Sequence, residues 1–155
     1  MPGPVLNLSS LKERLEAARR DGARVVLTNG VFDVLHVGHL RYLRQARALG
    51  DVLVVGINAD TAVRKAGRPL VADLERAELV AALEPVDYVV LFDQATADEL
   101  IRTLRPTIYA KGGDYSEVSL PEATTAREVG AEIVFLPLTP DRSSSRLIRM
   151  LEQRD

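Results

Sequence analysis

The two histidines of the 155-residue chain, His36 and His39, lie three positions apart in the segment VLTNGVFDVLHVGHLRYL. Gly38 stands between them, and Asn29-Gly30 lies a few residues upstream. An imidazole can transfer a proton near neutral pH, ligate a metal ion or donate a hydrogen bond to an anion. The segment therefore allows three interpretations: two structural histidines, a metal-binding pair, or a clamp for phosphate oxygens.

A metal-binding pair needs a third ligand, and the chain contains no cysteine to supply it. Asp33 or a distant carboxylate would have to take that place. A phosphate clamp requires less, because Gly38 leaves room for a nucleotide and two imidazoles can donate hydrogen bonds to oxygens on which negative charge develops. The spacing favours the clamp, although a lone histidine near a helix start is more often structural.

Five short runs rich in valine and isoleucine predict the strands that position this segment, and apolar residues recur at helical spacing between them. Near-continuous apolar strands alternating with helices predict one parallel sheet covered on both faces, a doubly wound α/β domain. Ligands of such sheets bind beyond the carboxyl ends of the strands, where the strand order reverses, and the first strand usually borders that crevice. The strands are expected at residues 24–28, 51–58, 86–92, 107–111 and 132–137, and the helices at 40–49, 73–83, 96–104 and 121–129.

Two further helices are expected near the chain ends. Ser10-Leu-Lys-Glu13 is a capping-box pattern that predicts a helix from Ser10 to about Arg20, and residues 143–145 precede a final helix. The segment RKAGRPL, residues 64–70, is expected to be a loop. No repeat or domain boundary is visible, so residues 1–155 are predicted to form a single domain.

Composition excludes several classes of protein. The 20 basic and 22 acidic residues leave a net charge of −2, so no global field attracts nucleic acid or a membrane surface. No apolar stretch approaches the roughly 20 residues that cross a bilayer, and the N-terminus lacks a signal-peptide pattern. The chain also lacks both G-x-G-x-x-G and G-x-x-x-x-G-K-[ST], which argues against a Rossmann dehydrogenase and a P-loop enzyme. A cytoplasmic protein is expected.

The stretch from Thr28 to Asp33, TNGVFD, followed by His36-Val-Gly-His39, resembles the signature of the nucleotidyltransferases with an H-x-G-H motif. This family includes cytidylyltransferases, several adenylyltransferases and, more distantly, class I aminoacyl-tRNA synthetases. Residues 75–76 at a helix start and the serines at 143–145 resemble its later motifs, so the likeness runs from about residue 24 to 151. The resemblance implies a Rossmann-like nucleotidyltransferase fold with a five-stranded parallel sheet.

Within this family, the segments VGINAD (55–60), RP (68–69), ERAE (75–78) and above all KGGDY (111–115) resemble heptose 1-phosphate adenylyltransferase, the domain found in ADP-heptose synthase. The resemblance implies a reaction that joins ATP and a sugar 1-phosphate, D-glycero-D-manno-heptose 1-phosphate, to give an ADP-sugar and pyrophosphate. It also implies Mg²⁺ carried with ATP, and a homodimer. A sugar kinase domain precedes this one in the bifunctional form, and 155 residues leave no room for it, so a freestanding transferase is expected.

Three alternatives stay open. Glycerol-3-phosphate cytidylyltransferases are similar up to the last strand but carry an arginine where this chain has Leu138. Phosphopantetheine adenylyltransferase has a similar serine run at 143–145 but lacks a KGGDY-like segment. A regulatory module that binds a nucleotide without turning it over is the alternative outside enzymes, and a pyrophosphate-release assay separates it from a transferase. A tRNA synthetase fragment is disfavoured because the chain lacks K-M-S-K-S.

The resemblance assigns roles to individual residues and places no metal ligand in the chain itself. The expected catalytic residues are His36, His39, Lys65 (or Arg64, if the loop shifts by one position) and Arg76. Those expected to bind the nucleotide are Thr28, Asn29, Gly30, Val31, Phe32, Gly38, Ser143, Ser144 and Ser145. Those expected to bind the sugar phosphate are Asp33, Asn58, Asp60, Lys111 and Asp114.

Ordinary structural roles compete with several of these assignments. Arg76 could pair with a neighbouring acid on its own helix, and the serines at 143–145 could simply cap the final helix. Lys65 could be a solvated loop charge. Asp33 could orient a histidine or fix the turn, and the sequence does not separate these two possibilities.

Overall fold

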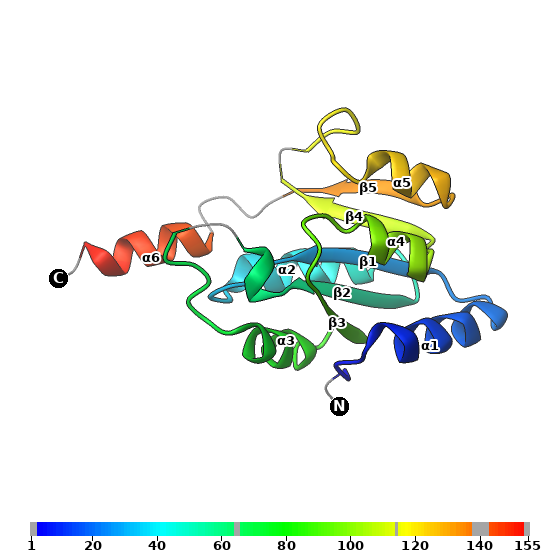
Figure 1. Ribbon diagram of the computed structural model, residues 1–155, viewed down its shortest axis with the longest axis horizontal. Helices are drawn as coiled ribbons and strands as arrows, with labels where there is room; N and C mark the ends of the chain where they lie inside the picture. Colours follow the sequence, from blue (N-terminus) through cyan, green and yellow to red (C-terminus); the bar gives the residue numbers. More distant parts are fainter. Residues whose placement is uncertain (1–2, 64–65, 114, 138–142, 154–155) are drawn as a thin grey trace.

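Five parallel strands form one sheet in the computed structural model, which describes residues 3–63, 66–113, 115–137 and 143–153 (Figure 1). Strand order is β3-β2-β1-β4-β5, and each neighbouring pair is parallel. The order reverses between β1 and β4, so the predicted doubly wound sheet, with its crevice beside the first strand, is confirmed. The strands are β1 (Val25–Gly30), β2 (Val52–Asn58), β3 (Tyr88–Phe92), β4 (Ile108–Gly112) and β5 (Glu132–Leu136).

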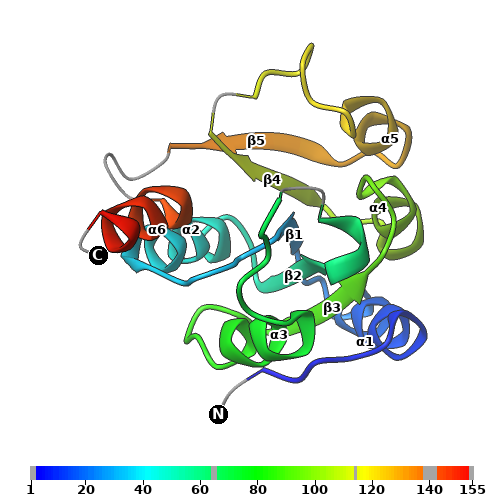
Figure 2. The ribbon, with the colours of Figure 1, turned by 60° about the vertical axis from the view of Figure 1, so that its left-hand side comes forward.

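Helices cover both faces of this sheet. Apolar residues of α1 (Leu8–Arg20), α4 (Asp98–Leu104) and α5 (Ala123–Glu128) pack on one face, and those of α2 (Val37–Arg47) and α3 (Asp73–Ala81) on the other. The final helix, α6 (Ser144–Glu152), lies outside these two layers, beyond the carboxyl ends of the strands (Figures 1 and 2). A single turn of 3-10 helix, η1 (Asp60–Ala62), follows β2. Among the described residues, no helix is long and apolar enough to cross a membrane.

The first helix corrects one detail of the sequence analysis. It begins at Leu8, and its N-cap is Asn7, whose side-chain oxygen accepts a hydrogen bond from the Ser10 amide at 2.8 Å. The expected start at Ser10 was wrong because asparagine caps a helix as well as serine does, and here it stands three residues earlier.

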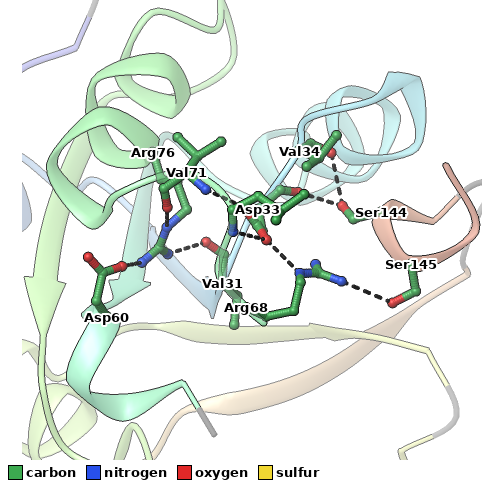
Figure 3. A network of polar contacts seen from close by, with 10 residues as sticks. Val31, Asp33, Val34, Asp60, Arg68, Val71, Arg76, Ser144 and Ser145 are labelled. Atoms are coloured by element: carbon green, nitrogen blue, oxygen red, sulfur yellow. Dashed lines mark hydrogen bonds and ion pairs between the residues drawn. The ribbon is translucent and has the colours of Figure 1, made fainter. Parts of the chain in front are cut away.

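Arg76 joins three segments around the loop that connects β1 to α2 (Figure 3). Its side chain is fully buried at the start of α3, and its Nε donates to the Val71 carbonyl at 2.8 Å. Nη1 donates to the Val31 carbonyl in the loop, and Nη2 forms an ion pair with Asp60 at 2.7 Å. One guanidinium therefore fixes the β1–α2 loop against both η1 and the segment before α3.

These contacts do not fit the roles expected of Arg76 and Asp60. A guanidinium that is fully buried and directed at two carbonyls and a carboxylate is not presented to a triphosphate, and Asp60 also accepts a hydrogen bond from the Asp73 amide. In this structure Arg76 and Asp60 therefore support the β1–α2 loop through the protein interior. The expected pairing of Arg76 with an acid on its own helix is replaced by a pairing with Asp60 across the chain.

We expect Arg76→Met to lower the free energy of unfolding by about 2–4 kcal/mol, because two partly buried carbonyls and one carboxylate lose the donor that a fully buried guanidinium supplies. Urea unfolding followed by circular dichroism measures this change. The matched control is Arg41→Met on the exposed surface of α2, which should change stability by less than about 0.5 kcal/mol. A stable Arg76→Met variant that has lost ATP affinity would instead support the role of a phosphate ligand.

Candidate active site

A cavity of about 290 Å³ lies beyond the carboxyl ends of β1 and β4, where the strand order reverses. This is the place that the doubly wound architecture reserves for a ligand, and the volume is close to that of small-molecule sites. The described residues that line it are Asn29, Phe32, His36, Gly38, His39, Tyr42, Lys111, Gly112, Tyr115, Ser143 and Ser144.

The two histidines cap the helix that carries them. His36 is the N-cap of α2, and its Nδ1 accepts a hydrogen bond from the Gly38 amide at 3.0 Å. His39 reaches back, and its Nδ1 accepts from the His36 amide at 3.2 Å. The two rings stack with their centres 3.9 Å apart. The H-x-G-H spacing thus produces a reciprocal capping box in which imidazoles replace the usual serine and glutamate.

This arrangement determines which ring nitrogen carries the proton. A nitrogen that accepts a hydrogen bond has no proton, so each neutral ring is protonated on Nε2. The two histidines line the cavity, and each is a donor through its Nε2–H. Burial, followed by the charge of His36, lowers the pKa of His39 to about 4, so this ring is neutral at physiological pH.

The helix start itself offers less to an anion than the sequence suggested. The Gly38 amide is engaged by the His36 ring, and the amides of His39 and Leu40 donate to the His36 carbonyl. The expectation that the amides at Gly38–Leu40 face the phosphates is therefore not met. The imidazole donors extend from the capped helix end in their place, together with the favourable dipole of α2.

The loop between β1 and α2 has an unusual backbone. Phe32 and Val34 have φ angles of 51° and 39°, a left-handed conformation that side chains rarely adopt and that costs about 1–3 kcal/mol each. The Phe32 ring packs against Gly30, where an added Cβ would lie 3.0 Å from a ring carbon. The centre of the Phe32 ring is 5.3 Å from the centre of the His39 ring. Because Gly30 has no side chain, the Phe32 ring can lie close to its backbone. Phe32 forms one wall of the cavity beside His39.

Asp33 anchors this loop (Figure 3). Its carboxylate, which is 2% exposed, accepts from the amides of Leu70 and Val71 and from Arg68 Nε, the last at 2.6 Å. Burial alone would raise the pKa of Asp33, but these donors lower it below its ordinary value. Both carboxylate oxygens are engaged by the protein, so Asp33 fixes the turn, and its expected contact with the sugar phosphate is not supported.

The three serines at the start of α6 cap the helix and attach it to the β1–α2 loop and to Arg68. Ser143 is the N-cap, and its hydroxyl oxygen accepts from the Arg146 amide at 3.0 Å. The Ser144 hydroxyl donates to the carbonyls of Asp33 and Val34, and Ser145 accepts from Arg68 Nη1 at 3.5 Å. Ser143 and Ser144 line the cavity, whereas Ser145 is not among its lining residues.

Asn29 and Lys111 form the side of the cavity over the sheet. The side-chain oxygen of Asn29 accepts a hydrogen bond from the Tyr109 hydroxyl, and the backbone carbonyl of Asn29 accepts one from Lys111 Nζ at 3.4 Å. Burial lowers the pKa of Lys111, and the charge of Glu122 opposes this change. Lys111 is the charged side chain among the described residues that line the cavity, and it is placed to meet an anionic ligand.

Three further predicted residues, Thr28, Val31 and Asn58, are not among the residues that line the cavity. Thr28 is buried, and its hydroxyl is hydrogen-bonded to Tyr42. Val31 contributes only a carbonyl to Arg76, and Asn58 at the end of β2 is not among the lining residues. Lys65, Arg64, Asp114 and Leu138 lie outside the described residues.

Sequence reasoning missed the roles of Arg68, Tyr42 and Tyr115. Arg68 was noted only as part of a family segment, yet it is the partner of Asp33; a buried acid beside a strand end could have prompted a search for its cation. Tyr42 and Tyr115 line the cavity, and Tyr42 also donates to the Ala110 carbonyl at 3.2 Å. Tyr42 lies three residues after His39 on α2, a helical spacing that could have placed both on one face.

Comparison with known proteins agrees with this geometry. A family model described as cytidylyltransferase-like matches residues 27–150. "Bifunctional protein HldE" of Syntrophotalea carbinolica is 45% identical over 148 residues, which are 94% of this chain and 30% of the relative. The protein of the same name from Citrifermentans bemidjiense is 45% identical over 154 residues, 95% of this chain and 31% of the relative. The chain thus spans about 30% of the length of these relatives.

One solved structure is similar over most of its length. The crystal structure of a lipopolysaccharide core biosynthesis protein from Thermoplasma volcanium superposes with a TM-score of 0.64 at 28% identity, covering 76% of this chain and 98% of that one. The family match includes most of β1, the H-x-G-H segment and most of α6, which contribute residues to the cavity. The chain belongs to the cytidylyltransferase-like family of nucleotidyltransferases.

Proposed function

We propose that this chain is an adenylyltransferase that joins ATP and a sugar 1-phosphate, D-glycero-D-manno-heptose 1-phosphate, to give an ADP-sugar and pyrophosphate. The observation that carries the proposal is the pair of imidazoles whose Nδ1 atoms accept backbone amides, so that each presents Nε2 as its donor, in one cavity with Lys111. The KGGDY segment at 111–115 supports the sugar, as does the similarity to proteins named HldE. The homodimer stays a prediction.

The proposed reaction needs positioning and donors more than proton transfer. An oxygen of the sugar phosphate attacks the α-phosphorus of ATP, a new P–O bond forms, and the bond to the β-phosphate oxygen breaks with release of pyrophosphate. Negative charge rises on the oxygens around the reacting phosphorus. His36 and His39 donate to the triphosphate through Nε2–H, and Lys111 neutralises an anionic group of the acceptor or nucleotide.

The chain's own residues fit a metal ion that arrives with the nucleotide better than one held by the protein. Among the described residues, no group of three histidine, aspartate or glutamate side chains is arranged to hold an ion. Asp33, the acid closest in sequence to the histidines, has both oxygens occupied. We therefore treat Mg²⁺ as part of the ATP substrate, which is how this ion usually enters nucleotide sites.

A regulatory module that only binds a nucleotide would not need two donors aligned on one side of the cavity. We expect His39→Ala to lower kcat by about 100-fold or more, with ATP affinity changed only a few-fold, because the donor acts mainly on charge that develops in the transition state. Pyrophosphate release measures kcat, and isothermal titration measures affinity.

His39→Gln is the matched control for this experiment, since its amide can donate from a position close to Nε2. We expect it to retain more activity than His39→Ala. Near-full activity of the alanine variant would contradict the proposed role. Loss of its fold by circular dichroism would mean that the cap on the His36 amide is the main contribution.

The pKa of His39, lowered to about 4, gives a second prediction. The unfolded chain, with an ordinary histidine pKa near 6.5, binds this proton more readily than the folded chain. The contribution of His39 to stability is therefore complete above about pH 6.5 and is lost as the pH falls toward 4. NMR titration of its Cε1–H should give a midpoint near 4. His39→Gln should reduce the pH dependence of the free energy of unfolding between these two pH values. A titration midpoint of His39 near 6.5 would contradict the buried, neutral ring.

The substrates are tested with ATP, CTP, GTP and UTP against heptose 1-phosphate, hexose 1-phosphates, glycerol 3-phosphate and phosphopantetheine. We expect the highest kcat/KM with ATP and an aldose 1-phosphate. Leu138 stands where the cytidylyltransferases carry a cation, so the base site has less means of selecting the cytosine edge. Preference for CTP with glycerol 3-phosphate, or for phosphopantetheine, would reject the heptose assignment while leaving the role of the histidines intact.

A further inference from the structure

Glu122 is a buried acid that the proposed reaction does not use. It is 5% exposed and stands at the N-cap of α5. Its Oε1 accepts one long hydrogen bond, from the Ala97 amide at 3.4 Å, and among the described residues its Oε2 has no partner. A carboxylate buried with so few donors is costly unless a positive charge nearby offsets its desolvation.

Lys111 is the cation that β4 places on the same side of the sheet as Glu122. It stands two residues after Tyr109 on β4, so both side chains leave the same face of the sheet. Tyr109 belongs to the core under α1, α4 and α5, which is the face from which Glu122 approaches. Burial lowers the pKa of Lys111, and the negative charge of Glu122 opposes this shift.

Tyr109 and Lys111, whose pKa values the charge of Glu122 affects, both donate hydrogen bonds to Asn29. The Tyr109 hydroxyl donates to its side chain, and Lys111 Nζ donates to its carbonyl. Burial and then the negative charge of Glu122 raise the pKa of Tyr109, which keeps the phenol protonated and therefore a donor. The same carboxylate thus favours the donor forms of the two side chains that fix Asn29 at the cavity wall.

We infer that Glu122 is a positioning residue whose buried carboxylate is the counter-ion that keeps the Lys111 ammonium charged and held against Asn29 before any phosphate binds. Asp98, the other acid that acts on Tyr109, is already paired with the hydroxyls of Thr96 and Thr125. The other titratable groups that line the cavity with Lys111 or act on Tyr109 are His36, His39, Tyr42 and Tyr115.

The inference predicts where in the catalytic cycle Glu122 matters. It rests on the proposed function only in that Lys111 meets an anionic substrate. A bound phosphate supplies its own negative charge beside the ammonium, so the need for Glu122 is greatest in the free enzyme. The pH dependence of kcat/KM reports on the free enzyme, and that of kcat reports on the complex. Loss of Glu122 should therefore affect the first profile more than the second.

Glu122→Gln tests the inference, because glutamine keeps an oxygen that can accept from the Ala97 amide while the charge is removed. The direct measurement is the titration of Lys111, assigned through Lys111→Met and followed by NMR at the lysine side chain. We expect Glu122→Gln to lower the titration midpoint of Lys111 relative to the native protein. Glu128→Gln, the same change at an exposed position of α5, is the matched control and should leave the midpoint unchanged.

The kinetic measurement uses ATP and the aldose 1-phosphate. Between about pH 7 and pH 10, kcat/KM of Glu122→Gln should fall earlier than that of the native protein, while the kcat profile should move less. If the native protein releases no pyrophosphate with any acceptor, the proposed function fails, but the Lys111 titration still decides the role of Glu122.

Three results would overturn the inference. An unchanged Lys111 midpoint in Glu122→Gln would make Glu122 a cap of α5 only. A midpoint that moves in Asp114→Asn instead would assign the counter-ion to that residue. If Glu122→Gln does not fold, the double variant with Lys111→Met should recover the fold, because two opposite buried charges are then removed together; failure to recover it would also count against the pair.

Discussion

The buried carboxylate of Asp33 is the interaction on which the geometry of the site depends. It gathers Arg68 and the amides of Leu70 and Val71 around one strand end, and these donors more than offset the cost of burying the charge. The residues on either side of it, Phe32 and Val34, hold left-handed backbone conformations that would relax without such an anchor. The strain at the β1–α2 loop is therefore balanced by contacts from segments distant in sequence, including the Ser144 hydroxyl of α6.

The consequence of that anchor is seen at the start of α2. His36 follows the strained loop directly, and its place at the N-cap allows its ring and that of His39 to accept backbone amides through Nδ1. Helix capping and tautomer selection are thus the same interaction. A serine or aspartate would cap the helix equally well, but it would offer no N–H donor beyond the capping group. An imidazole has a second nitrogen, so it can cap the helix and still donate from Nε2.

Much of the fold could be predicted from the sequence, because five nearly continuous apolar runs separated by helical spacing permit few other architectures. The position of the crevice followed from the same pattern. The direction of individual side chains did not. Arg76 and Asp33 have the residue types of phosphate and sugar ligands, yet both point into the protein, since residue type and spacing do not reveal which backbone groups in distant loops lack partners. The contacts of Asp33 and Ser143 are those of the structural alternatives, since the Asp33 carboxylate accepts the Leu70 amide and the Ser143 hydroxyl caps α6.

Under the proposed function, the electrostatics of the cavity would explain how a chain with a net charge of −2 binds anionic substrates. The described lining residues include one charged side chain, Lys111, and two histidines, of which His39 is held neutral by burial. Attraction for the ground-state triphosphate is therefore moderate, and a metal ion that accompanies ATP reduces it further. Neutral donors gain most when charge on the reacting oxygens increases, so in the proposed reaction the His39 imidazole would stabilise the transition state more than the bound substrate. A cavity lined by several permanent cations would instead hold substrate and pyrophosphate tightly, and release of the product would become slow.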